Sequence, residues 1–133
     1  MYKGINMEKL LIQASKYTPE INLDSSSNIF SIVGKSYPEN TFEFYKPISL
    51  WVEEYLATIH DKEIVFNLEL EYLNSSSLKA YFDLFDIIEL SHEKGQKVVI
   101  NWIYDEDNDI AEETGEDFIE DFKSLKINLV VKD

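Results

Sequence analysis

The 133-residue sequence predicts an α/β domain in which a mixed β-sheet of about six strands packs against about three helices. Segments with apolar residues at every second position, typical of half-buried strands, alternate with segments whose apolar residues recur every three or four positions, typical of amphipathic helices. The order is three strands, then helix, strand, helix, strand, helix and strand, which favours right-handed crossovers between parallel neighbours. No linker or repeat divides the chain, so we expect a single domain over residues 1–133 with its core at about residues 10–131.

Alternating or continuous apolar runs locate the strands. The expected strands are Leu10–Ala14, a segment starting with Ile21 and Leu23, Ile29–Gly34, Ile64–Tyr72, Val98–Tyr104 and Leu125–Val131. Ser25–Asn28 has the composition of a hairpin turn between the second and third of them. Val98–Tyr104 is nearly all apolar, which predicts a central strand covered on both faces.

Three segments have helical spacing. Pro47 fits the first turn of the first helix, where its missing N–H costs nothing. The buried stripe of that helix is expected to comprise Ile48, Trp51, Val52, Tyr55 and Leu56. The second helix should run from about Ser76 to His92, with Gly95 closing it. The third is acidic and spans about Ile110 to Phe122.

The segment Leu73–Lys79 joins the fourth strand to the second helix and holds three adjacent serines. Free N–H groups and the positive end of the helix dipole make such a junction favourable for an added negative charge, so a phosphorylated serine would be stabilised there. The alternative is purely structural, with Asn74 or Ser75 capping the helix. The local sequence leaves both interpretations open.

The composition excludes several classes of protein. There are 26 acidic residues against 12 basic ones, all lysine, and the net charge of −14 disfavours nucleic acid and anionic lipid as partners. The absence of cysteine excludes disulfides and thiolate metal sites. No apolar stretch approaches the roughly 20 residues of a membrane span, and no signal-peptide pattern is present, so we expect a cytoplasmic protein.

The acidic segment Asp105–Asp121 gives the strongest suggestion of a metal site. Asp105, Asp107, Asp109 and Glu116 match a calcium-loop template, but Ile110 stands where the template needs glycine. A solvated acidic face is therefore favoured. His60 and His92 follow or end helices, where a cation complements the dipole, and neither has a neighbouring nucleophile. We expect no enzymatic activity, no metal and no cofactor.

The loop before the first helix is a candidate contact surface. Aromatic residues flank it closely, and loops on a rigid scaffold often carry binding residues. The expected partner-binding residues are Ser36, Tyr37, Pro38, Glu39 and Asn40. Pro38 biases Tyr37 away from helical geometry, which supports a loop here.

Several blocks together resemble the SiaC family of bacterial regulatory phosphoproteins, over about Leu10 to Val131. They are Gly34–Asn40 (GKSYPEN), Phe44–Ile48 with Trp51, Leu70–Ser77 (LEYLNSSS), Trp102–Tyr104, and Gly115–Asp117 after the acidic stretch. The resemblance implies a fold like that of STAS domains, with a regulatory hydroxyl at a strand-to-helix junction.

The resemblance also implies a function and a site. The acceptor in the family is usually the threonine after the asparagine, which corresponds to Ser75 here, with Ser76 as the alternative. Asn74, Ser76, Ser77 and Lys79 would surround the phosphate. The implied partners are a serine/threonine kinase, a PP2C-type phosphatase, and a diguanylate cyclase that the unphosphorylated form binds and activates, in the control of cyclic di-GMP and biofilm formation. The rival hypotheses are a small metal- or ligand-binding enzyme and a constitutive acidic scaffold.

Overall fold

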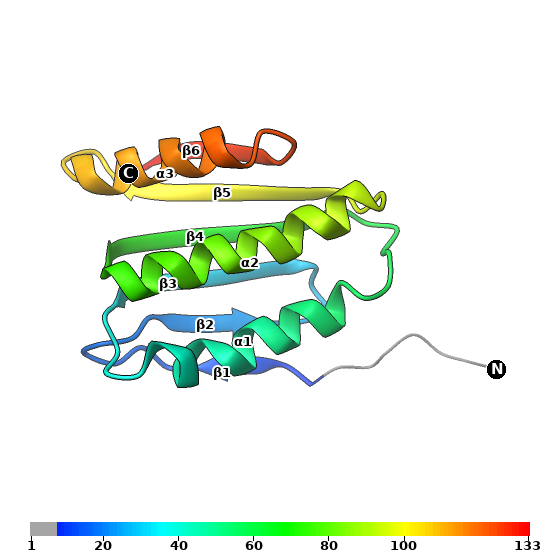
Figure 1. The fold of residues 1–133 in the computed structure, drawn as a ribbon, viewed down its shortest axis with the longest axis horizontal. Helices are drawn as coiled ribbons and strands as arrows, with labels where there is room; N and C mark the ends of the chain where they lie inside the picture. Colours follow the sequence, from blue (N-terminus) through cyan, green and yellow to red (C-terminus); the bar gives the residue numbers. More distant parts are fainter. Residues whose placement is uncertain (1–7) are drawn as a thin grey trace.

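The computed structural model describes residues 8–133, which form one six-stranded sheet and three helices (Figure 1). The strands are β1 (Leu10–Ile12), β2 (Glu20–Leu23), β3 (Ile29–Ser36), β4 (Ile64–Leu73), β5 (Val98–Asp105) and β6 (Lys126–Lys132). The helices are α1 (Thr41–Tyr55), α2 (Ser75–Glu93) and α3 (Asp109–Asp121). The predicted α/β class, the number of elements and their order are confirmed.

The six strands lie in the sheet in their order along the chain. β1, β2 and β3 pair antiparallel, whereas β3, β4, β5 and β6 pair parallel, so the predicted mixed sheet is also confirmed. Each parallel crossover advances in the same direction across the sheet. Right-handed crossovers of this kind place their helices on one face, and Figure 1 shows α1, α2 and α3 together in front of the sheet.

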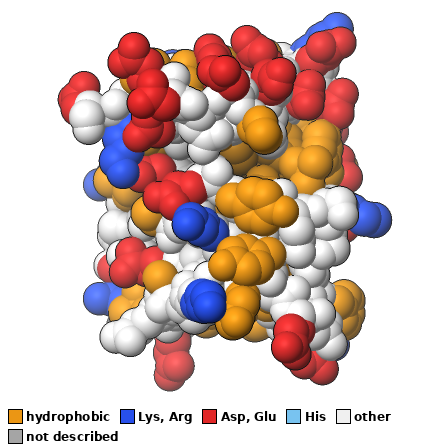
Figure 2. Space-filling model, turned by 90° about the vertical axis from the view of Figure 1, so that its left-hand side faces the viewer, with side chains coloured by type: hydrophobic (Ala, Val, Ile, Leu, Met, Phe, Trp, Pro, Cys, Tyr) orange, Lys and Arg blue, Asp and Glu red, His pale blue; other side chains and the backbone are white. Residues whose placement is uncertain are grey.

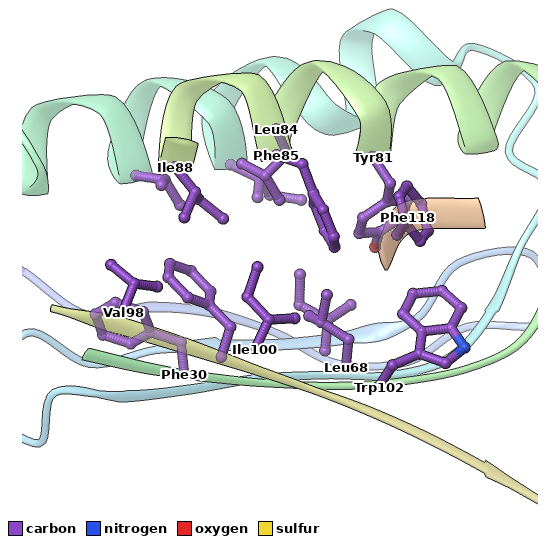
Figure 3. Close-up of a cluster of buried hydrophobic side chains, with 14 of the residues drawn as sticks. Phe30, Leu68, Tyr81, Leu84, Phe85, Ile88, Val98, Ile100, Trp102 and Phe118 are labelled. Atoms are coloured by element: carbon purple, nitrogen blue, oxygen red, sulfur yellow. The ribbon is translucent and has the colours of Figure 1, made fainter. Parts of the chain in front are cut away.

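The hydrophobic core lies between the helices and this one face of the sheet. Figure 3 shows side chains of α2 directed at side chains that rise from the strands. Phe118 of α3 is fully buried and its ring packs 4.3 Å from Phe85 and 5.2 Å from Trp102, measured between ring centroids. The Trp102 indole N–H also donates to the carbonyl of Ala111 at 2.8 Å, which ties β5 to the first turn of α3.

No helix of the described residues covers the opposite face of the sheet, so the prediction that β5 is covered on both faces was wrong. Asn67, Asn101 and Asn128 stand side by side on this face in adjacent strands. Asn101 donates to Asn67 at 2.9 Å, and Asn128 donates to Asn101 at 3.0 Å. The apolar run led to the wrong prediction because Val99 and Ile103 are apolar although they lie on the uncovered face. Packing between neighbouring strands leaves Val99 only 7% exposed.

The start of α1 also differs from the prediction. The helix begins at Thr41, because the Asn40 side chain accepts a hydrogen bond from the Glu43 N–H and caps it there. Pro47 therefore lies inside the helix and not in its first turn. Pro47 and Glu43 are both exposed, so water can satisfy the Glu43 carbonyl that a proline four residues later leaves without a partner.

Two strands end two residues away from their predicted ends. β1 ends at Ile12, before the predicted end at Ala14. β3 continues beyond Gly34 through a bulge between Gly34 and Lys35, and it includes Ser36, which had been expected in the loop. Gly34 has a φ of +134°, a value that favours glycine, and this allows the irregular geometry.

Candidate functional site

The junction between β4 and α2 lies at the end of the molecule where the parallel strands finish and all three helices begin (Figure 1). Figure 2 faces this end. Hydrophobic side chains gather over its centre, and acidic side chains line the top, where β5 and α3 lie. Because three helix N-termini meet here, backbone N–H groups and positive dipole ends are concentrated at this surface.

Asn74 is the residue that caps α2. Its side-chain oxygen accepts from the backbone N–H of Ser77 at 2.8 Å, and its own N–H donates to the carbonyl of Ser36 at 3.0 Å. Of the two capping residues that the sequence left open, the structure selects Asn74. The N–H groups of Ser75 and Ser76 keep no partner among residues 8–133, because the first turn of a helix cannot satisfy its own donors.

The three serines differ sharply in accessibility. Ser77 is fully buried, so its hydroxyl is out of reach of a modifying enzyme in this conformation. Ser76 is exposed, but its hydroxyl donates to the Asn74 side chain at 3.2 Å and pairs with the Thr41 hydroxyl at 2.6 Å. Ser75 is exposed, and its side chain makes no hydrogen bond to any described residue. Ser75 is thus the most available of the three hydroxyls.

A chain of buried hydroxyls runs from this junction into the core. Ser36 lies 2.7 Å from Ser77 and 2.6 Å from the Tyr45 hydroxyl, and Tyr45 donates to Tyr81 at 3.0 Å. Since each hydroxyl has one proton, Ser36 must donate to Tyr45, and Ser77 must donate to Ser36. The chain of hydroxyls fixes the end of β3, the first turn of α2 and the second turn of α1 relative to one another. The sequence analysis missed it, because the three serines look alike in sequence.

Burial of the two tyrosines makes stability sensitive to alkaline pH. Desolvation raises the pKa of Tyr45 above its ordinary value of 10.0, and desolvation together with the Tyr45 hydroxyl raises that of Tyr81 well above it. Above pH 10 the unfolded chain loses these protons while the folded chain keeps them, so folding stability present below pH 10 is lost as pH rises. Urea unfolding from pH 8 to 11 should show this loss. The Tyr81→Phe variant should lose less stability over this pH range than the native protein does. An equal loss in both proteins would contradict the role of the Tyr81 hydroxyl.

The cap assignment predicts a difference between two adjacent positions. Asn74→Ala should lower the free energy of unfolding by about 1–2 kcal/mol, because the Ser77 N–H loses its acceptor. Ser75→Ala should change it by less than about 0.5 kcal/mol, since the Ser75 side chain is exposed and unpaired. Urea denaturation of both variants measures this. Equal losses would mean that Ser75 shares the capping role.

Lys79 lies one helical turn after Ser75, on an exposed face of α2. Its ammonium group pairs with Asp83 at 3.3 Å, and both side chains are largely exposed. Such a surface pair contributes little to stability, so Lys79 can exchange its partner at small cost. Residues four apart on a helix are neighbours, which places Lys79 within reach of a group added to Ser75.

The predicted partner-binding loop is only partly accessible. Ser36 is fully buried in the hydroxyl chain, so it cannot contact a partner directly in this conformation. Tyr37 and Pro38 are half-buried, whereas Glu39 and Asn40 are exposed. The error arose because β3 extends further than its pattern indicated.

A row of three tyrosines borders the junction and was not predicted. The rings of Tyr17 and Tyr37 lie 5.2 Å apart, and those of Tyr37 and Tyr72 lie 5.8 Å apart, both edge to face. Tyr17 and Tyr72 are about half exposed, at 49% and 51%. The alternation of β4 placed Tyr72 in the core, but the strand passes the end of the core after Leu70. Ile110, at the start of α3, is 76% exposed nearby and lines a hollow of about 260 Å³ with Leu73 and Leu78.

The acidic segment and the two histidines were the other candidate sites. Within residues 8–133 no group of three or more histidine, aspartate or glutamate side chains is placed to hold a metal ion. Asp109 and Glu116 of the calcium-loop template both lie in α3, while Asp105 ends β5. His60 donates to the Tyr55 carbonyl at 2.8 Å, at the end of α1, as expected of a histidine that complements a helix C-terminus. No helix of the described part of the chain combines the length and apolarity of a membrane span.

Comparison with known proteins supports the resemblance seen in the sequence. The model of the SiaC family regulatory phosphoproteins matches residues 12–132. An uncharacterized protein of Pseudomonas aeruginosa (strain UCBPP-PA14) is 38% identical over 115 residues, which cover 86% of this chain and 90% of that protein.

Two solved structures from Pseudomonas aeruginosa have the same fold. The crystal structure of apo-SiaC is 34% identical with a TM-score of 0.84, covering 94% of this chain and 100% of SiaC. The second is the crystal structure of the diguanylate cyclase SiaD in complex with its activator SiaC. The matching chain is 36% identical with a TM-score of 0.86, covering 92% of this chain and 99% of that one. The chain therefore belongs to the SiaC family of regulatory phosphoproteins.

Proposed function

We propose that this protein is a non-enzymatic activator of a diguanylate cyclase and that phosphorylation of Ser75 switches its activity off. The observation that carries the proposal is the state of Ser75. It is the exposed serine of the junction with no side-chain hydrogen bond, at the first position of a helix that Asn74 already caps. A phosphate there would cost the fold no existing interaction. Ser76 is the second choice, because its phosphorylation would break the bond to Thr41.

The junction can stabilise the phosphate locally. A phosphoserine adds about −1.5 to −2 charges and three acceptor oxygens. The unpaired N–H groups of Ser75 and Ser76 and the positive end of the α2 dipole favour that charge. Lys79, one turn away, supplies a cation that is held only by an exposed pair with Asp83. The modified junction therefore stays folded, and the effect of the phosphate falls on the surface.

The surface around Ser75 is suited to a protein partner. The row Tyr17, Tyr37 and Tyr72 lies beside the junction, and exposed aromatic rings are frequent anchors of protein interfaces. Of the loop residues, we propose Tyr37, Pro38, Glu39 and Asn40 as direct contacts, with Ser36 acting only by holding them in place. A partner surface that offers no cation would have to cover the phosphate dianion and remove its water. This costs several kcal/mol, so phosphorylation would release the partner.

The same proposal includes the enzymes that act on the switch. A serine/threonine kinase and a PP2C-type phosphatase would add and remove the phosphate, as the family resemblance implies. The SiaC relative is an activator of SiaD, which favours a regulatory and not a catalytic role for this chain. We place this activity in the cytoplasm, where the kinase, the phosphatase and the cyclase would all have access to the protein.

The test is to mix the unmodified protein with purified diguanylate cyclases encoded in the same genome and to measure cyclic di-GMP synthesis. The proposal predicts that one of them is stimulated at equimolar protein. The negative control is the Tyr81→Asp variant. It places a charge in the core and should not fold, so it should not stimulate the cyclase. Failure of the native protein to bind or stimulate any cyclase would contradict the proposed function.

A further inference from the structure

The face of the sheet opposite the helices carries its side chains in ordered rows, and we call it the open sheet face. The middle row crosses five strands and contains only uncharged polar residues, namely Asn22, Ser31, Asn67, Asn101 and Asn128. Apolar residues form much of the rows beside it, namely Ile29, Val65 and Val99 on one side and Val33, Ile103 and Val130 on the other. Ile29 and Val130 are 53% and 38% exposed.

The open sheet face carries little net charge on a strongly acidic protein. The charged residues within its three rows are Glu20, Glu69 and Lys126, and Glu69 is paired with Lys132 at 2.8 Å. By contrast, α3 alone carries seven acidic residues and no basic one, and the net charge of the chain is −14. Two copies that met through their helices would repel one another, whereas two open sheet faces can meet with less repulsion. The centres of protein interfaces are likewise depleted of charge.

The open sheet face is large enough to hold two copies of the chain together. At about 3.3 Å per residue and about 4.8 Å between strands, a sheet of this size has roughly 600 Å² per face. Two faces together would bury roughly 1,200 Å², the lower end of the range for specific interfaces. The described structure begins on the other side of the sheet, where the Glu8 carbonyl accepts from the Trp51 indole of α1 at 2.8 Å. A second copy therefore suits the open sheet face better than residues 1–7 do.

We propose that the open sheet face is the interface of a homodimer, with a two-fold axis along the middle row. Each strand then faces its counterpart in the second copy, and each residue of the row faces its own equivalent. Asn101 donates to Asn67 and Asn128 donates to Asn101, which uses one of the two N–H groups of each donating amide. The remaining N–H groups can bond reciprocally across the axis. The same symmetry places Val99 of each copy on Ile103 of the other, so apolar residues cover one another.

This homodimer leaves the junction accessible in both copies. The helices lie on the far side of each sheet (Figure 1), so Ser75 stays exposed when the open sheet faces are covered. Because the axis reverses the strand direction, the two junctions lie at opposite ends of the dimer. The homodimer therefore does not depend on the proposed function, and neither excludes the other.

The first arm of the test measures the mass of the purified protein by sedimentation equilibrium over a series of concentrations. The native protein should approach twice the monomer mass of 15.6 kDa, and added salt should strengthen the dimer by screening the repulsion between acidic copies. Asn101→Asp is nearly isosteric and sets two carboxylates against each other, so it should weaken self-association at least about tenfold. The control is Phe42→Asp, which adds the same charge to α1 at a residue that is 71% exposed, and it should associate like the native protein. Circular dichroism checks that both variants are folded.

The second arm locates the interface by crosslinking. The chain has no cysteine, so a single introduced thiol reports on one position. Ser31→Cys is nearly isosteric and lies in the middle row, on the third of the six strands. Packed sheets lie about 10 Å apart, so a bismaleimide of that span should link two copies of this variant. The matched control is Ser49→Cys on α1, on the helix side, which should stay unlinked.

The outcomes separate the homodimer from the proposed function. A native protein that stays monomeric at every concentration and salt would overturn the homodimer. Dissociation by Phe42→Asp but not by Asn101→Asp, or crosslinking of Ser49→Cys in place of Ser31→Cys, would also overturn it, because the contact would then lie on the helices. None of these results bears on cyclase stimulation. Failure to stimulate any cyclase would contradict the proposed function alone, and the two arms would still decide on the homodimer.

Discussion

Ser75→Asp is expected to weaken the complex with the diguanylate cyclase by about 5- to 150-fold, the range of typical coupling between two sites. The new carboxylate would lie at the first position of α2, next to the tyrosine row. A negative charge at a helix N-terminus stabilises the fold by about 0.3–1 kcal/mol, so the loss cannot arise from unfolding. Calorimetry with the purified cyclase measures the affinity, and cyclic di-GMP synthesis measures the consequence.

Two further variants isolate the effect of the charge at this position. Ser75→Ala should bind the cyclase as the native protein does, because the hydroxyl makes no hydrogen bond within the described residues. Thr58→Asp adds the same charge at the other end of the molecule, in the exposed segment between α1 and β4, and should leave the affinity unchanged. If Thr58→Asp weakens the complex as much as Ser75→Asp does, the effect is one of net charge and the site assignment is wrong.

Gly115→Ala is expected to destabilise the fold by about 1–3 kcal/mol, although alanine is the better helix former. Gly115 lies in α3 directly above β5 and β6. A methyl group there would lie 2.5 Å from Cδ1 of Trp102 and 2.6 Å from a methyl carbon of Leu129. The Trp102 ring cannot move aside freely, because its N–H donates to the Ala111 carbonyl and Phe118 packs against it. Thermal or urea unfolding measures the loss.

The neighbouring position supplies the control for this substitution. Glu116 is exposed, so Glu116→Ala should change stability by less than about 0.5 kcal/mol. If Gly115→Ala were as stable as the native protein, α3 would have room to rise from the sheet, and the close contact with Trp102 would not be essential. The indole N–H resonance of Trp102 in NMR spectra would report the same change directly.

Local patterns were sufficient to predict the order of elements. The period-two runs in β4 and β6 and the helical spacing in α2 are long enough that no other assignment fits them. The right-handedness of crossovers then implied the parallel half of the sheet. The uncovered face was not predictable from β5 alone, because Val99 and Ile103 are apolar and packing against neighbouring strands protects Val99.

The site was predictable only as a segment. The sequence located the junction at Leu73–Lys79, but it could not distinguish Ser75, Ser76 and Ser77 by physical means. The distinction depends on Ser36 and Thr41, which lie 41 and 35 residues away from their hydroxyl partners. The tyrosine row could not be predicted either, because it also depends on pairing between distant segments. The register shift after Gly34 sets Lys35 opposite Tyr72, which lies beyond the core.

One signal in the sequence did anticipate the role of Asn74. Asparagine directly before a segment of helical spacing is a preferred N-cap, and its spacing to Ser77 is that of a side chain that accepts from the third helical residue. The cap was therefore available as an inference, whereas the burial of Ser77 was not. Helix start signals are local, but burial is decided by the packing of β3 and α1 against α2.

Phosphopeptide mapping of the protein purified from its native cell tests the central claim most directly. Tandem mass spectrometry should distinguish phosphate on Ser75 from phosphate on Ser76 or Ser77 in a peptide that spans the junction. We predict a single phosphate, on Ser75, in a fraction of the protein that changes with growth conditions. Finding the three serines unmodified under every condition, or finding the phosphate on Ser77, would contradict the assignment of Ser75 as the switch.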